Sequence, residues 1–281
     1  MRVDLQIHSD ALPHHSSWRT GTLIPALRVA GISVFAITDH NTVAGVDAMR
    51  RAADQAGLAC IAACEIDCTH NGKLWHALLY GIDPTHPDIL ELCASVDARN
   101  VLDARHILRQ LTRRGYHMPY DVDSDGTLRS TGRHPNVAEL AKAFAGHNVL
   151  PERVDADDEM AGMRIFLAEK LYNPHHIADV IGVAHNTGGV AVLAHPGRSK
   201  GVYAIPADAA DIASMVGVGL DGLEVFYPAH SDAQTAFLQA QAQQHNLLIS
   251  GGSDSHHPDQ PLAQWDATPM LPLLRRCGLR I

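Results

Sequence analysis

Short apolar runs alternate with helix-like segments along most of this 281-residue chain, and no other feature constrains the fold as strongly. The apolar runs are residues 3–7, 32–37, 58–63, 74–80, 189–194, 222–226 and 247–249. Helical spacing marks residues 23–30, 46–56, 176–186, 208–216 and 232–245 between them. Helices cover both faces of a parallel sheet, so its strands appear as continuous apolar runs. The alternation therefore predicts an α/β fold with a mostly parallel sheet.

The alternation stops between residues 86 and 185. This stretch has helical spacing at 87–114, in one or two helices, and again at 135–144 and 160–171, without a strong strand pattern. We therefore predict that residues 1–85 and 186–281 form the α/β domain and that residues 86–185 form an inserted, all-helical cap. Residues 271–280 are interpreted as a short C-terminal tail.

Potential metal ligands follow the apolar runs, at or just past the end of each predicted strand. They are His8, His40, Glu65, His195, Asp254 and His256, and His76 lies within a run. Each alone could be an ordinary loop or core residue, but functional groups of parallel α/β folds converge at the carboxyl ends of the strands. A cluster of imidazoles and carboxylates suits manganese, iron or zinc better than magnesium.

The segment Gly251-Gly252-Ser253-Asp254-Ser255-His256 shows this pattern most clearly. Its two glycines are predicted to let the backbone turn sharply at the end of a buried strand.

The net charge and the cysteine content indicate which functions and which cellular compartment the sequence favours. A net charge of -9 argues against a dedicated nucleic-acid-binding surface. Five cysteines, an odd number, indicate free thiols in a reducing compartment. Cys60, Cys64 and Cys68 are spaced like zinc ligands, but the strand pattern around them favours three core thiols. We expect a cytoplasmic protein without a membrane span, because no signal peptide and no apolar run of about 18 residues is visible.

Taken together, the motifs resemble the PHP (polymerase and histidinol phosphatase) family of metal-dependent phosphoesterases. The matching stretches are DLQIHS (4–9), AITDHNT (36–42), CEI (64–66), His76, LAHPG (193–197) and GGSDSH (251–256). The Gly132-Arg133 motif is also similar to the branch that contains 3′,5′-nucleotide bisphosphate phosphatases and 5′-to-3′ exoribonucleases. The resemblance implies a distorted (β/α)7 barrel with up to three metals, usually manganese.

The resemblance also implies a distribution of ligands. His8, Glu65 and Asp254 would hold one metal, and Glu65 would bridge to a second that His76 and His195 also bind. The remaining pair, His40 and His256, would hold a third. A metal-activated hydroxide would attack phosphorus, so Glu65, His195 and Asp254 are the expected catalytic ligands.

Three further side chains are expected near the substrate. Arg133 and Arg198 would pair with phosphate, for which the planar guanidinium is suited; Arg133 could equally be an exposed surface residue. His230 would bind or protonate the leaving group, or else be an exposed residue at a helix start.

Two positions depart from the family pattern. Gln6 stands where the family has the first histidine of His-x-His, and Thr20 stands at the aspartate of Ser-Asp-Gly. We expect Gln6 near the substrate and two bound metals rather than three. Three residues of the lengthened loop, Asp10, His14 and His15, either replace the missing ligands or are ordinary loop residues.

The sequence therefore predicts a metal-dependent phosphoesterase that hydrolyses a small phosphorylated metabolite or a nucleotide such as a 3′,5′-bisphosphate, without a stable nucleic-acid partner. Two alternatives stay open. One is a non-catalytic module that binds metal and phosphate, suggested by Gln6 and Thr20. The other is an enzyme of the wider amidohydrolase type that cleaves an amide.

Overall fold

The structure is a computed structural model of the whole chain. It describes residues 1–12, 15–113, 121–123, 126–130, 132–137, 139–141, 166, 170–198 and 206–281. The chain divides into two compact units. The first comprises Met1–Ala94, His176–Arg198 and Pro206–Ile281, and the second Ser95–His175 and Ser199–Ile205. The domain limits predicted from the sequence, and the all-helical character of the insertion, stay predictions.

The second unit contains most of α3 (Pro87–Arg113), a single continuous helix of 27 residues. Val122 and Leu128 form an isolated antiparallel bridge within the same unit. The helices expected at 135–144 and 160–171 fall largely outside the described residues.

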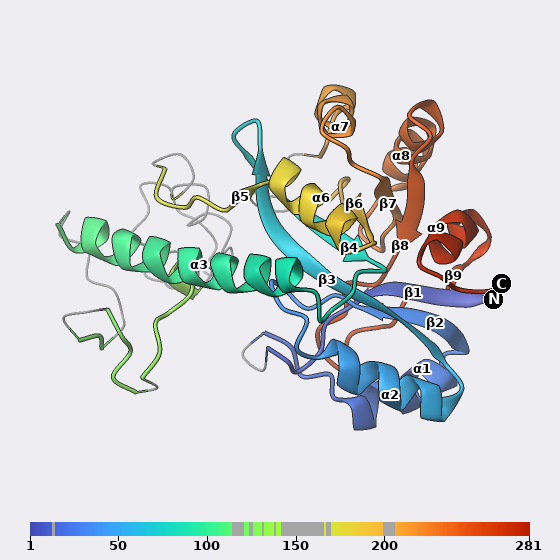
Figure 1. Cartoon of the computed structure of the whole chain (residues 1–281), viewed down its shortest axis with the longest axis horizontal. Helices are drawn as coiled ribbons and strands as arrows, with labels where there is room; N and C mark the ends of the chain where they lie inside the picture. The colour runs from blue at the N-terminus through green and yellow to red at the C-terminus, as the bar shows by residue number, and fades with distance from the viewer. Residues whose placement is uncertain are drawn as a thin grey trace. The chain divides into compact units, whose positions relative to one another are not determined.

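A mixed sheet forms the first unit (Figure 1). Its strands are β1 (Arg2–Ile7), β2 (Ile32–Ile37), β3 (Ala59–His70), β4 (Lys73–Tyr80), β6 (Val190–Leu193), β7 (Gly222–Phe226), β8 (Leu248–Gly251) and β9 (Trp265–Asp266). They lie in the order β8-β7-β6-β4-β3-β2-β1-β9, and β5 (His175–His176) pairs with β3 off this path. Neighbours are parallel except β3–β4, β4–β6 and β1–β9.

The reversal at β4 has a local cause in the sequence. Asn71 and Gly72 connect β3 to β4, and both have positive φ angles, 50° and 72°. A two-residue Asn-Gly turn with two positive φ angles is the preferred connection of an antiparallel hairpin. β4 therefore returns alongside β3 instead of crossing over to a parallel position.

Contacts between the two ends of the sheet nearly close it into a barrel. Ile7 forms a parallel bridge with Ser255, and the backbone NH of Asp254 donates to the carbonyl of Gln6 at 2.9 Å. A Cβ at Gly252 would lie 2.4 Å from the Cβ of Gln6. The glycine is thus required by close backbone approach, and not by the sharp turn that we expected. The predicted α/β barrel is confirmed.

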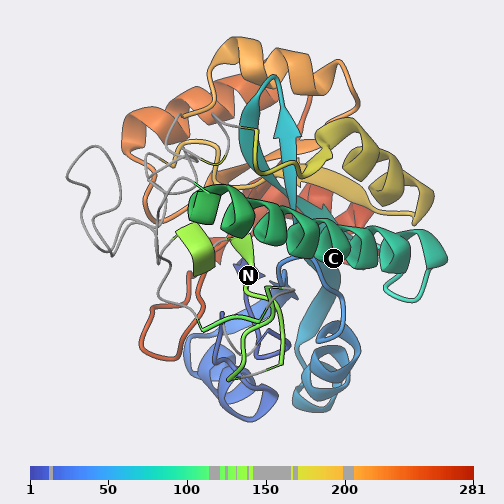
Figure 2. The same ribbon diagram turned by 90° about the vertical axis from the view of Figure 1, so that its left-hand side faces the viewer.

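Helices cover the sheet on two sides, as Figure 2 shows for α1 and α2 below and α6 to α8 above. Their bounds are α1 (Thr20–Val29), α2 (Val46–Ala56), α6 (Ile177–Asn186), α7 (Ala209–Val216) and α8 (Asp232–Gln244). Asp208 and Ser231 cap the backbone NH groups of α7 and α8, as acidic and hydroxyl residues commonly do. Gly57, at φ 72°, ends α2 in the left-handed conformation.

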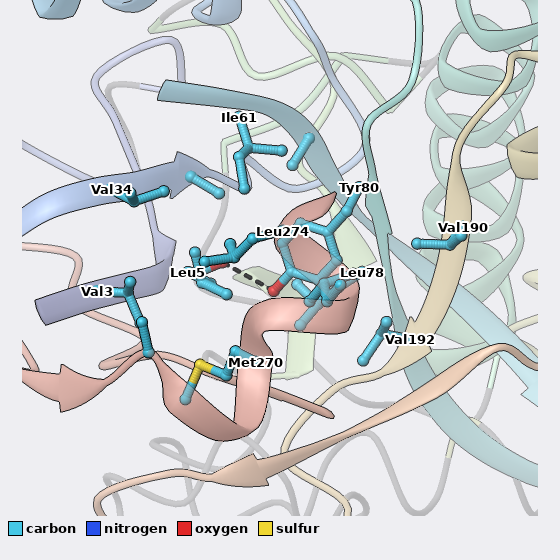
Figure 3. Close-up of a cluster of buried hydrophobic side chains, with 14 of the residues drawn as sticks. Val3, Leu5, Val34, Ile61, Leu78, Tyr80, Val190, Val192, Met270 and Leu274 are labelled. Atoms are coloured by element: carbon cyan, nitrogen blue, oxygen red, sulfur yellow. Dashed lines mark hydrogen bonds between the residues drawn. The ribbon is translucent and has the colours of Figure 1, made fainter. Parts of the chain in front are cut away.

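The barrel interior is apolar at its amino-terminal end (Figure 3). Leu5, Leu78 and Val192 pack there, and the Tyr80 hydroxyl donates to the carbonyl of Leu5 at 2.8 Å. A 3-10 helix, η2 (Thr268–Met270), and α9 (Leu271–Arg276) fill this end. The predicted C-terminal tail is therefore wrong, because buried Leu273 and Leu274 make it part of the core.

Along β3, the side chains that face the barrel interior change from apolar to polar. Ile61 and Ala63 belong to the core cluster, and Glu65 and Asp67 follow at the same two-residue spacing, which places them on the same face of the strand. The predicted strand ended at residue 63, so the placement of Glu65 past its end is wrong. Pairing with β4 continues as far as His70 and keeps these polar residues in the ladder.

Candidate metal centre

The first unit brings seven predicted ligands into one cluster at the polar end of the barrel. They are His8, His40, Glu65, His76, His195, Asp254 and His256. Four overlapping groups each offer ligand atoms within 4.8 Å of one another: His8–His40–His256, His40–Asp67–His76, Glu65–His76–His195 and His8–Glu65–Asp254. Two of these groups have the membership that the resemblance implied for the first and second metals.

Glu65 lies at the centre of the cluster and is fully buried. Its Oε1 is 2.7 Å from Nδ1 of His76 and 3.1 Å from Nε2 of His195. Its Oε2 is 3.3 Å from Nε2 of His8 and 3.7 Å from Nε2 of His40. Each carboxylate oxygen thus faces a different pair of imidazoles.

The C-terminal motif adds two candidate ligands beside His8. Asp254 Oδ1 is 3.1 Å from Nε2 of His8. The ring of His256 stacks on that of His8, with centroids 4.0 Å apart. Nδ1 of His256 lies 2.7 Å from the carbonyl of Asp254, and because a carbonyl only accepts, that nitrogen carries the proton. Nε2 of a neutral His256 is therefore the nitrogen that can bind a metal.

Two of the candidate ligand residues have left-handed backbones. The φ angle is 31° at His195 and 57° at Asp254, a region that residues other than glycine rarely adopt. Such strain persists only where surrounding contacts hold it, and it concentrates at functional sites. For His195 one such contact is the carboxylate of buried Glu224, which accepts from the His195 backbone NH at 2.7 Å.

The charged groups of the cluster shift one another's pKa values. Burial alone would raise the pKa of Glu65, but the charges of His40 and His76 hold it well below its usual range. Burial would likewise lower the pKa of His8, but its hydrogen bonds to Asp254 and Glu65 raise it to about 10. The pKa of His76 is also raised to about 10, against burial, mainly by Glu65. Without a cation, these imidazoles carry protons that balance the carboxylates.

The donor set fits divalent cations. Nδ1 of His8 and Oε1 of Gln6 are buried and have no hydrogen-bond partner within the described part of the chain. An unpaired buried polar atom costs about 1–3 kcal/mol, so such atoms are expected where a ligand belongs. Imidazole nitrogens with two carboxylates suit manganese, iron or zinc.

The residues expected to compensate for the missing ligands lie in different places. His15 Nε2 is 2.8 Å from Nε2 of His256, and its ring also meets that of His40, with centroids 4.9 Å apart. Asp10 instead pairs with Arg19 at 3.5 Å, and both side chains are exposed. His14 falls outside the described residues. Thr20 is the first residue of α1.

Gln6 is fully buried, and its Nε2 donates to Oε2 of Glu65 at 3.1 Å. Arg198 lies beside the cluster, with its NH1 3.4 Å from Oδ2 of Asp254. The hydroxyl of Tyr227 donates to the same oxygen at 3.2 Å. The predicted contacts of Gln6 and Arg198 with substrate stay predictions.

His230 is held by the main chain on both sides of its ring. Nδ1 donates to the carbonyl of Val225 at 3.0 Å, and Nε2 accepts from the NH of Gly197, also at 3.0 Å. Both nitrogens are occupied, which argues against the predicted proton transfer to a leaving group. This geometry favours a positioning role for His230 in the loop that follows His195.

Arg133 belongs to the second unit. Its two terminal nitrogens contact Glu139 at 2.7 and 2.5 Å, so its fork is already paired with a carboxylate. Its predicted contact with substrate phosphate stays a prediction.

Asp67 is the residue of the cluster that the sequence analysis missed. Its Oδ1 is 3.2 Å from Nε2 of His76 and 3.6 Å from Nδ1 of His40. Two-residue alternation from Glu65 could have identified it, had the strand been extended past residue 63. Within the described residues, no cysteine belongs to these groups. Cys64 and Cys68 are buried free thiols, in line with the interpretation as core residues.

A family model supports the assignment that the geometry suggests. The PHP domain model matches residues 4–146, which are 143 of the 281 residues. The chain belongs to the PHP domain family. The predicted resemblance is thereby confirmed, and the cluster lies at the end of the barrel where this PHP chain gathers its imidazoles and carboxylates.

Curated PHP relatives match most of the chain. The 5′-3′ exoribonuclease Rnm of Escherichia coli is 30% identical and covers 88% of this chain and 85% of its own. A phosphoribosyl 1,2-cyclic phosphate 1,2-diphosphodiesterase of Eggerthella lenta is 26% identical, covering 91% and 94%. A 3′,5′-nucleoside bisphosphate phosphatase of Chromobacterium violaceum is 26% identical, covering 89% and 87%. These relatives are phosphoesterases that act on different substrates.

Solved structures share the fold. A candidate metal-dependent phosphoesterase from Bifidobacterium adolescentis superposes with a TM-score of 0.71 at 24% identity, over 99% of this chain and 97% of the other. An amidohydrolase from Chromobacterium violaceum, with bound sulfate, gives 0.70 at 22% identity over 98% and 97%. Within the described residues, no helix is both long and apolar enough to cross a membrane.

Proposed function

We propose that this PHP protein hydrolyses a phosphate ester of a small metabolite or nucleotide, with a 3′,5′-nucleoside bisphosphate as the first candidate. A divalent cation, manganese first and iron or zinc otherwise, supplies Lewis-acid polarisation and a lowered pKa of bound water when it occupies such a centre. The residues of the chain hold the cations, fix the phosphate and keep the ligands in place.

Glu65 is the observation that carries the proposal. One carboxylate oxygen faces His76 and His195, and the other faces His8 and His40. A carboxylate placed in this way could help to hold two cations. Two cations would stabilise the charge on the attacking and leaving oxygens in phosphoryl transfer. We accordingly expect two bound metals, with His8 and Asp254 completing one site.

A third cation site would be weaker. His40 and His256 would hold it, and His15 is placed to join them through its contact with His256. An imidazole would then stand in for the carboxylate that the family pattern supplies at position 20. This substitution favours a borderline metal such as zinc over manganese at that site.

Arg198 would bind the phosphate of the substrate. Its side chain is 22% exposed and lies next to Asp254, so it is accessible and close to the proposed cations. The planar guanidinium matches phosphate geometry in a way that a lysine would not. Pairing with Asp254 would keep it oriented until a phosphate competes for it.

An activity assay tests the proposal. The purified protein is supplied with Mn²⁺, Fe²⁺ or Zn²⁺ and given a 3′,5′-nucleoside bisphosphate, a phosphomonoester, a cyclic phosphodiester, a short 5′-phosphorylated RNA and an amide. We expect metal-dependent cleavage of a phosphate ester, with the bisphosphate among the substrates, and none after chelation or in Glu65→Gln. Absence of turnover on every phosphate ester, with metal bound, would refute the proposal.

A non-catalytic binding module is the second candidate, and Gln6 is the observation that favours it. The amide donates to Oε2 of Glu65, where the family pattern has an imidazole that could bind a cation. This alternative predicts metal and phosphate binding in the wild-type protein, and no rate for Glu65→Gln to abolish.

A further inference from the structure

Asp67 stands opposite His76 in the ladder between β3 and β4. Its side chain is 14% exposed and lies on the same face of β3 as Glu65, two residues away. The proposed function gives Asp67 no task, although its carboxylate lies within 4.8 Å of ligand atoms of both His40 and His76. A carboxylate that is largely shielded from solvent among imidazoles calls for a physical explanation.

One oxygen of Asp67 faces two imidazoles at once. Oδ1 is 3.2 Å from Nε2 of His76 and 3.6 Å from Nδ1 of His40. The opposite nitrogens of these rings point to Glu65: Nδ1 of His76 lies 2.7 Å from Oε1 and Nε2 of His40 lies 3.7 Å from Oε2. Each ring therefore spans the space between the two carboxylates.

Asn41 fixes the other side of Asp67. Its Nδ2 donates to Oδ2 of Asp67 at 3.2 Å, and its Oδ1 accepts from the Asp67 backbone NH at 3.0 Å. Asn41 also has a left-handed backbone, with φ 55°. The carboxylate is thus held with Oδ1 directed at the two rings.

A neutral imidazole has one NH and one lone pair, so it can bind a metal through only one nitrogen while the other donates. Metal-binding histidines characteristically donate their second NH to a carboxylate or carbonyl. We infer that Asp67 is a positioning residue. It accepts the NH of His76 Nε2 at 3.2 Å and attracts the NH of His40 Nδ1 across 3.6 Å, which directs His40 Nε2 and His76 Nδ1 toward the metal centre around Glu65. The inference rests on the metal centre of the proposed function.

Asp67 could instead be a metal ligand together with His40 and His76. This role is disfavoured because each neutral imidazole has a single lone pair and can bind a metal through only one nitrogen. If the nitrogens facing Asp67 bound a cation, those facing Glu65 would carry protons and could not bind another. The Glu65 side offers His195 and His8 as additional ligands. The Asp67 side offers fewer, so cations will occupy the Glu65 side.

Asp67→Asn tests the inference by metal titration rather than by activity. The amide has only one accepting oxygen, so it cannot accept from Asn41 and from the rings together. We expect the dissociation constants for Mn²⁺ and Zn²⁺ to rise about 10- to 100-fold, while Asp47→Asn, an exposed acid in α2, changes nothing. Asn41→Gly, which tolerates the positive φ, should weaken binding less than Asp67→Asn.

The tautomers of His40 and His76 distinguish a positioning role of Asp67 from a purely structural one. In the zinc-loaded wild-type protein, long-range ¹H–¹⁵N correlation spectra should show His76 protonated at Nε2 and His40 at Nδ1. The inference is overturned if either ring shows the opposite tautomer, or if folded Asp67→Asn binds metal as tightly as the wild type. Wild-type protein that binds metal but cleaves no phosphate ester would refute the proposed function alone.

Discussion

Nε2 of His8 lies 3.1 Å from Oδ1 of Asp254, although the residues are 246 positions apart in the chain. Together with Glu65, this contact raises the pKa of His8 to about 10 in the metal-free protein. The pKa of His76 is raised to about 10 as well. Both imidazoles therefore carry a proton at neutral pH, and a cation must displace those protons to bind.

Metal affinity should accordingly rise with pH. Below pH 10 each displaced proton makes the apparent dissociation constant fall about tenfold per pH unit, since metal ligands must be deprotonated. Calorimetric titration with Mn²⁺ at pH 6.5, 7.5 and 8.5, in buffers of different ionisation enthalpy, would count the released protons. An affinity that is independent of pH would show that His8 and His76 bind no metal.

Gly252 should be irreplaceable by alanine. A Cβ there would lie 2.4 Å from both Cβ and the backbone nitrogen of Gln6, and backbone can yield only by separating β1 from the segment after β8. We expect Gly252→Ala to lower the free energy of unfolding by about 1–3 kcal/mol or more and to weaken metal binding, because Asp254 would move from His8.

Gly21→Ala provides the matched control. Nothing lies within 4 Å of a Cβ at this position in α1, so the change should be neutral or stabilise by up to about 1 kcal/mol. Urea unfolding of both variants measures the comparison. Equal stability of the two variants would contradict the close approach that closes the barrel.

We expect His15 to contribute to the binding of the most weakly held metal ion. Its contact with Nε2 of His256 places it beside the third proposed site. We expect His15→Ala to leave about two tightly bound metals and to remove any weaker one in a zinc titration. The exposed His106 of α3 is the control, and a similar loss in His106→Ala would exclude a specific role for His15.

The sequence anticipated this architecture because strands and helices of an α/β barrel have clear periodicities. The bounds predicted for β2, α2 and β7 match the structure, and each is a continuous apolar or amphipathic segment between glycines or polar turns. The C-terminal helix was missed because a segment of six residues is too short to show helical spacing. Only its burial against the barrel stabilises it.

The site was predictable where ligands follow strands and less so elsewhere. His8, His40, His195 and Asp254 could be placed from the end of an apolar run. Asp67 could have been placed only by extending β3 past residue 63 to the Asn71-Gly72 turn that joins it to β4. The position of His15 depends on loop geometry, which neither periodicity nor composition encodes.

We expect His230 to hold the loop that follows His195 in place and not to transfer a proton. Its two ring nitrogens bind the backbone at Val225 and Gly197, so His230→Ala should destabilise the protein by about 1–3 kcal/mol and slow turnover. The limbs of the pH–rate profile should keep their apparent pKa values, because the group does not titrate in the reaction. Loss of one limb in the variant would instead assign His230 the acid role.

The most direct test of the central claim is the number of metal ions per chain in wild-type protein and in Glu65→Gln, measured by elemental analysis after equilibrium dialysis. An amide has one accepting oxygen where the carboxylate has two, so it cannot bridge two cations. We predict about two ions per wild-type chain and at most one in the variant. Equal metal content in the two proteins, with both folded, would contradict a centre built around Glu65.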